Sequence, residues 1–155
     1  MKTDAKIKLG IPLYPAFDSL DVLGPLQVFN YAPNISVSLI AATDNAVTSL
    51  EGVRIMQDLT FSSFADPESD KLDVLFVPGA SDLVGPLQQA PLGKNELLDF
   101  LVSQAEHAQL VCPVCTGALL LGAAGLLDGH LATTHWTQLE TLKLFPCTVA
   151  VGYPR

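Results

Sequence analysis

Cys115 is the residue best placed for chemistry, in the stretch QLVCPVCTGALLL at residues 109–121. The apolar run that starts at Leu110 is typical of a strand, whereas the residues from Gly117 onward favour a helix. A sharp strand-to-helix turn exposes the residue at its apex, as in the nucleophile elbow usually built around serine. Because Gly117 is small, it would let the helix pack close to the strand. The pattern therefore predicts a cysteine nucleophile elbow.

A thiol at this turn would lie beside the free N–H groups of a helix N-terminus. Those groups and the helix dipole stabilise a thiolate, so we expect the pKa of Cys115 to be lowered and its sulfur to be reactive. The alternative is that Cys115 is a small buried core residue, as most cysteines are. Spacing alone leaves both interpretations open.

Cys112 and Cys115 also have the C-x-x-C spacing of a redox dithiol. A thioredoxin-like motif would follow an early strand, and this pair lies more than a hundred residues into the chain. With Cys112 in a strand, the two side chains need not face each other. A zinc site would need further ligands, and no second C-x-x-C or nearby Cys/His cluster supplies them, so we expect no metal.

The composition limits the possible classes of protein. The chain has 155 residues, 49% of them hydrophobic and 15% charged, which predicts one globular domain with a real core. No apolar run reaches the eighteen or so residues needed to span a bilayer. The net charge of −8 argues against nucleic acid or an anionic membrane as a partner, because both need clustered Lys and Arg. Three cysteines and an N-terminus without a signal-peptide pattern predict a cytoplasmic protein.

Strand and helix patterns alternate along the chain, which predicts an α/β fold of the flavodoxin-like kind, with a mostly parallel sheet between helices. The predicted strands cover residues 6–14, 35–41, 72–77 and 110–114, with a hairpin over 46–50 and 53–59, an extended piece at 131–136 and a last strand from 148. The predicted helices cover 20–31, with a break that makes Pro25 a first helical residue, then 95–108, the residues after the elbow, and 137–144. Residues 61–70 are expected to form a loop, and 81–93 a loop or one short helix.

Ligands bind at strand ends in such sheets. Three candidate ends converge here, at residues 14–21, 78–80 and 115–116. We therefore expect a small-molecule site where these segments meet.

Three blocks carry a family resemblance: IPLYPAFDSLDVLGPLQVF at residues 11–29, LDVLFVPGA at 72–80, and VCTGALLLGAAGLLDGHLATTHW at 114–136. They resemble the ThiJ/PfpI superfamily, which has the class I glutamine-amidotransferase-like fold. Cys-Thr-Gly at the elbow, with Leu-Asp-x-x-Gly-Pro near the N-terminus, looks most like isonitrile hydratases and the related sensor-type domains of AraC-like transcription regulators.

The resemblance implies roles at matching positions. Cys115 would be the nucleophile, Asp21 its acidic partner, and Thr116 the residue after the nucleophile, where many members carry histidine. The anion-stabilising or substrate-binding groups would be the backbone N–H groups of Thr116 and the residues Gly79, Ala80, Gly117 and His135, the last matching a family histidine.

The implied activity is conversion of an isonitrile to an N-substituted formamide. A thiolate can add to an electrophilic carbon, and the terminal carbon of an isonitrile must gain both a nucleophile and a proton. Asp21 close to Cys115 could supply that proton, and two crowded acidic groups titrate as a coupled pair. Water would then hydrolyse the thioimidate-like intermediate, so neither a metal nor an organic cofactor is required.

Each of these residues also has a simpler structural interpretation. Asp21 could cap or solvate the first helix, Thr116 could bond to the nearby backbone, and His135 beside Trp136 could be a semi-buried structural histidine. The whole chain could be a non-catalytic ligand-sensing domain. A glyoxalase- or deglycase-like activity is a further alternative. Two features argue against it: no histidine follows Cys115, and position 21 holds an aspartate (Asp21) and not a glutamate.

The resemblance also bears on the extent and assembly of the chain. The family normally continues with another strand, a turn and a helix. We therefore expect one domain over residues 1–155 that lacks those elements. The superfamily commonly forms homodimers with the first helix near the interface, so a homodimer is expected.

Overall fold

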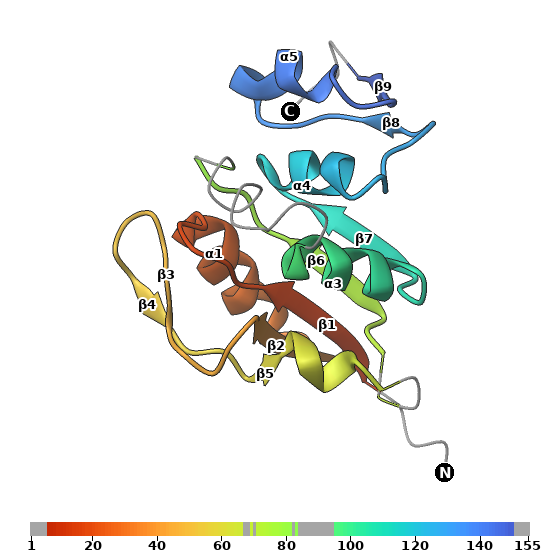
Figure 1. The fold of residues 1–155 in the computed structure, drawn as a ribbon. Coiled ribbons are helices and arrows are strands. Elements are labelled where there is room, and N and C mark those ends of the chain that lie inside the picture. Colours follow the sequence, from red (N-terminus) through yellow and green to blue (C-terminus); the bar gives the residue numbers. More distant parts are fainter. Residues whose placement is uncertain (1–5, 67–68, 70, 82, 84–94, 151–155) are drawn as a thin grey trace.

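The computed structural model describes residues 6–66, 69, 71–81, 83 and 95–150 (Figure 1). Its elements are β1 (Ile7–Pro12), α1 (Ser19–Phe29), β2 (Ile35–Ala41), β3 (Val47–Thr48), β4 (Arg54–Ile55), β5 (Leu59–Thr60), the 3₁₀ helix η1 (Phe61–Phe64), β6 (Val74–Val77), α3 (Glu96–Ala105), β7 (Leu110–Pro113), α4 (Gly117–Ala123), β8 (Leu131–Ala132), the 3₁₀ helix η2 (Trp136–Gln138), α5 (Leu139–Leu142) and β9 (Thr148–Val149). Most of the expected loop or short helix at 81–93 lies outside the described residues.

The central sheet contains five parallel strands in the order β5-β2-β1-β6-β7. Across the sheet, the connection from β1 to β2 runs in one direction and the connection from β6 to β7 runs in the opposite direction. Right-handed crossovers therefore place α1 and α3 on opposite faces of the sheet. This arrangement confirms the predicted α/β fold, and it makes the neighbours β1 and β6 the switch point at which such sheets bind ligands.

Apolar side chains fill both faces of the inner strands. Ile11, Ile40 and Leu75 are completely buried in β1, β2 and β6. On the α1 side, the ring of Phe29 packs edge-on against Phe76 of β6 at 5.7 Å between centroids. Each fully buried side chain of this size contributes roughly 1.5–3 kcal/mol, so the core holds the strand ends in fixed relative positions.

α1 runs without a break from Ser19 to Phe29, so the predicted interruption at Pro25 is wrong. Pro25 lacks an N–H group and removes one helical hydrogen bond. The first turn is held by carboxylates instead: Asp18 accepts from the Leu20 N–H at 3.0 Å, and Glu51 accepts from the Ser19 N–H at 3.1 Å. The helix thus begins well before the proline and continues through it to Phe29.

The predicted hairpin is confirmed in a shorter form, as the antiparallel pair β3 and β4. Leu59, predicted to end the hairpin, instead begins β5, which pairs in parallel with β2. Asp58 accounts for the difference. Its N–H donates to the Leu39 carbonyl and its carboxylate accepts from the Leu39 N–H, both at 2.8 Å. The 3₁₀ helix η1 then occupies part of the expected loop.

The last described segment forms a small unit of its own. Figure 1 shows α4 between β7 and the two-stranded sheet of β8 and β9. The final strand thus pairs in parallel with β8 and does not join the central sheet. Within the described ranges, no helix has both the length and the apolar character needed to cross a bilayer.

Candidate active site

Cys115 sits at the apex of the turn between β7 and α4, with a backbone φ of 53°. This left-handed conformation is unusual for a residue with a Cβ. Gly117 makes the turn possible, because a Cβ there would lie 2.3 Å from the Val77 carbonyl oxygen and 2.9 Å from that of Pro78. The structure therefore has the predicted elbow geometry, with α4 starting close against the end of β6.

The backbone at the end of β6 is bound on both sides. Gly79 donates its N–H to Oδ2 of Asp21 at 3.0 Å, and its carbonyl accepts from the Asp18 N–H at 2.9 Å. Ala80 donates its N–H to Oγ1 of Thr116 at 2.8 Å, and the same hydroxyl donates to the Ala80 carbonyl at 2.7 Å. These contacts confirm that the three predicted strand ends converge.

Tyr14 also belongs to this cluster, although the sequence analysis gave it no role. It is buried at the carboxyl end of β1, and its hydroxyl donates to the Pro78 carbonyl at 2.7 Å. The available signal was a tyrosine before a proline at the end of an otherwise apolar strand, since a buried Tyr hydroxyl needs a partner.

Asp21 and Cys115 lie near enough to influence each other's pKa. Burial raises the pKa of Asp21, and the Gly79 N–H and a hydrogen bond with Cys115 partly oppose this. Burial also raises the pKa of Cys115, and the charge of Asp21 raises it further, whereas the Thr116 N–H lowers it. The lowered thiol pKa expected from the helix N-terminus is therefore wrong, because burial and the carboxylate outweigh it. Both groups therefore hold their protons to higher pH than usual.

Most of the predicted anion-binding N–H groups already have protein acceptors. Those of Gly79 and Ala80 bind Asp21 and Thr116, as described above. The Gly117 N–H donates to the Val114 carbonyl at 2.8 Å. The Thr116 N–H lowers the pKa of Cys115, although burial outweighs it. The N–H groups of Gly79, Ala80 and Gly117 are therefore already engaged and not free to bind a charged substrate oxygen.

His135 lies against the elbow from the β8 side. Its N–H and the Thr134 hydroxyl both donate to the Cys115 carbonyl, at 3.2 and 3.0 Å. Its ring Nδ1 lies 2.7 Å from the Thr137 hydroxyl, and its charge lowers the pKa of Asp21. The structure therefore brings His135 to the site, together with Thr134, which the sequence analysis did not single out.

Cys112 and Cys115 are both free thiols. Among the described residues, no group of three or more His, Cys, Asp or Glu side chains is arranged to hold a metal ion.

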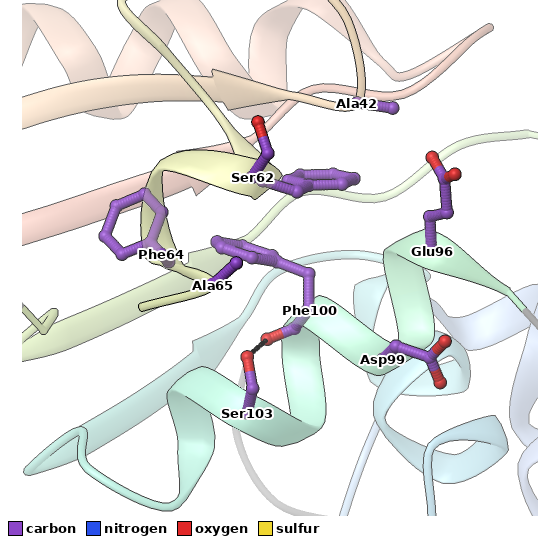
Figure 2. A pocket seen from close by; sticks show the side chains of 9 residues that line it. Ala42, Ser62, Phe64, Ala65, Glu96, Asp99, Phe100 and Ser103 are labelled. Carbon is purple, nitrogen blue, oxygen red and sulfur yellow. Dashed lines mark hydrogen bonds between the residues drawn. The ribbon is translucent and has the colours of Figure 1, made fainter. Parts of the chain in front are cut away.

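A separate pocket of about 400 Å³ lies between η1 and α3 (Figure 2). Phe61 and Phe100 stack in it with their ring centroids 4.4 Å apart. Its charged lining residues, Glu96 and Asp99, are both acidic. None of its lining residues belongs to the Cys115 cluster, so this pocket is distinct from the candidate active site.

Comparison with known proteins gives a consistent result. The family model described as the DJ-1/PfpI family matches residues 8–149. An isonitrile hydratase from Pseudomonas putida is 40% identical over 143 residues, which are 90% of this chain and 58% of the relative. The crystal structure of a ThiJ/PfpI family protein from Pseudomonas syringae superposes with a TM-score of 0.82 at 30% identity, over 96% of this chain and 58% of that one.

A shorter match points to a different kind of protein. The HTH-type transcriptional regulator GbdR of Pseudomonas aeruginosa is 39% identical over 49 residues, which are 32% of this chain and 13% of the regulator. The chain thus spans well under two thirds of the length of the hydratase and of the regulator.

Thr116→Val tests the link between the elbow and β6. We expect the free energy of unfolding to fall by about 2–4 kcal/mol, because the buried N–H and C=O of Ala80 would both lose their partner. Thr116→Ser keeps the hydroxyl and should recover most of that loss. Urea unfolding followed by circular dichroism measures both, and a Val variant as stable as the parent would contradict this account.

Alkylation by iodoacetamide tests whether the charge of Asp21 raises the pKa of the Cys115 thiol. In a Cys112→Ser background, the rate at Cys115 should rise with pH along a curve whose midpoint lies above that of an ordinary cysteine. Asp21→Asn should move this midpoint to lower pH, because the negative charge that raises the thiol pKa is removed. Peptide mass spectrometry follows Cys115, with Cys147 as an internal reference. An unchanged midpoint in the Asn variant would rule out the coupling.

Proposed function

The chain belongs to the DJ-1/PfpI family, and from that premise we propose that it is a cysteine-dependent hydratase that converts an isonitrile to an N-substituted formamide. The observation that carries the proposal is that the bonds of Gly79 to Asp21 and of Ala80 to Thr116 bring the Asp21 carboxylate to the elbow that presents Cys115, which pairs a nucleophile with a proton donor. The 40% identity to an isonitrile hydratase over 90% of the chain supports the same reaction.

In the first step the Cys115 sulfur bonds to the terminal carbon of the isonitrile. The proton released by the thiol reaches the same carbon through Asp21, which gives a thioimidate, R–N=CH–S–Cys. Water then adds to that carbon, with one proton passing through Asp21 to nitrogen. Departure of Cys115 as the thiol releases R–NH–CHO, so the cycle consumes one water and regenerates the enzyme.

The occupied N–H groups at Gly79 and Ala80 favour this reaction over a glyoxalase- or deglycase-like one. Thiolate addition to a carbonyl leaves a negatively charged oxygen, which needs free donors aimed at it. Both of these N–H groups are bound within the protein. Addition to an isonitrile instead requires a proton at carbon, and the raised pKa of Asp21 helps to retain one.

A second candidate is a non-catalytic ligand-sensing domain. The likeness to a transcriptional regulator over 49 residues favours it. A sensor would bind small molecules at the same site without turning them over, so an activity assay separates the two.

The assay is incubation of the protein with cyclohexyl isocyanide and detection of N-cyclohexylformamide by mass spectrometry. Cys115→Ala should abolish formamide formation, and Asp21→Asn should slow it by about 10²-fold or more, the usual contribution of a positioned acid or base. Cys112→Ala is the matched control and should retain activity, because that thiol has no place in the reaction. No formamide from a folded parent would contradict the hydratase, and binding without turnover would support the sensor.

We further propose that the protein is a cytoplasmic homodimer with α1 at its interface. Leu20, Val28 and Tyr31 are 74%, 67% and 82% exposed on or just after α1, an apolar surface that association would bury. A reducing compartment would keep the three free thiols available. Analytical ultracentrifugation should show a dimer, and Val28→Lys should weaken it. A monomeric parent would contradict the proposed dimer. Recovery of the protein from an oxidising compartment would contradict the proposed cytoplasmic location.

A further inference from the structure

One peptide unit beside the candidate active site is bound at both of its ends. The Pro78 carbonyl accepts from the Tyr14 hydroxyl at 2.7 Å, and the Gly79 N–H on the same unit donates to Asp21 at 3.0 Å. The described residues contain no cis peptide bond, so the C=O and N–H point in opposite directions from a rigid plane. Tyr14 and Asp21 therefore hold the same plane from its two sides.

The neighbouring peptide units are held by the Asp18 and Val114 N–H groups, whereas the polar groups of this unit are held by Tyr14 and Asp21. The proline ring of Pro78 fixes φ, so rotation about its ψ angle is what turns the plane. Gly79 has no side chain, and a Cβ there would lie 2.7 Å from the backbone N and Oγ1 of Thr116. The Tyr14 hydrogen bond at the carbonyl is thus a polar contact that restrains this rotation from the side opposite Asp21.

As a refinement of the hydratase proposed above, we infer that Tyr14 is a positioning residue that fixes the Pro78–Gly79 plane and so aims the Gly79 N–H at the Asp21 carboxylate.

Tyr14 is well suited to this role. Its side chain is 3% exposed, and the Leu13 N–H before it donates to the Ile40 carbonyl at 2.6 Å, which ties the end of β1 to β2. Burial raises the pKa of Tyr14, and the negative charges of Asp21, Cys115 and Asp18 raise it further. The hydroxyl therefore stays a donor. Donation to one end of a peptide also polarises the N–H at the other end, which strengthens its bond to the carboxylate.

Tyr14→Phe removes the hydroxyl and keeps the ring. Without it, the Gly79 N–H is less polarised and less well aligned, so the Asp21 carboxyl should titrate at higher pH, by about half a unit or more. Carbon-13 NMR of labelled aspartate measures this directly, in a protein whose other groups facing Asp21, namely Asp18, Cys115 and His135, are unchanged. Tyr31→Phe is the matched control and should leave the titration unmoved, because Tyr31 is not among the groups that shift the pKa of Asp21.

The NMR titration does not depend on turnover, so it distinguishes failure of this inference from failure of the hydratase proposal. If formamide is produced, the acidic limb of the kcat/KM profile should move to higher pH together with the Asp21 titration. A folded Tyr14→Phe protein with the Asp21 titration of the parent overturns the inference. If that variant does not fold, 3-fluorotyrosine can replace Tyr14. Its hydroxyl is a stronger donor and should move the Asp21 titration to lower pH. An unchanged Asp21 titration in that protein would equally overturn the inference.

Discussion

The hydroxyl of Thr116 both accepts from and donates to the backbone of Ala80, and these two hydrogen bonds join the elbow to the end of β6. Thr116 directly follows Cys115, so this contact sets where the sulfur lies. Both partners are buried, which means that water cannot replace either bond and losing them leaves polar groups unpaired. The close approach also requires Gly117, because any side chain there would meet the carbonyls of β6.

β6 lies between β1 and β7 in the sheet, and its end acts as a spacer between the two halves of the site. Gly79 binds the carboxylate that α1 presents after β1, and its neighbour Ala80 binds the residue that follows the thiol after β7. Adjacent residues of one strand end therefore determine how far Asp21 lies from Cys115. A parallel sheet makes this possible because it brings the carboxyl ends of distant segments to one edge.

The sequence was sufficient for those features that depend on local pattern. Alternation over residues 35–41 predicted β2 to the residue, and the change from strand to small residues to helix predicted the elbow at Cys115. The interruption predicted at Pro25 was wrong, because α1 already begins at Ser19, where one acceptor for its first N–H groups is Glu51, a hairpin residue distant in sequence. The direction of the Cys115 pKa could not be predicted either, since it depends on burial and on a carboxylate supplied by another element.

The raised pKa values bear on how the proposed reaction would work. A thiol with a strongly lowered pKa beside an ionised Asp21 would be a thiolate with no nearby proton to give. Hydration of an isonitrile needs sulfur and a proton at the same carbon, so a pair that holds one proton is better matched to it than two fully ionised groups. The intrinsic nucleophilicity of a thiolate also rises with its pKa. A raised thiol pKa thus lowers the fraction of thiolate, but in the proposed reaction each thiolate would be more nucleophilic and a proton on Asp21 would lie near the isonitrile carbon.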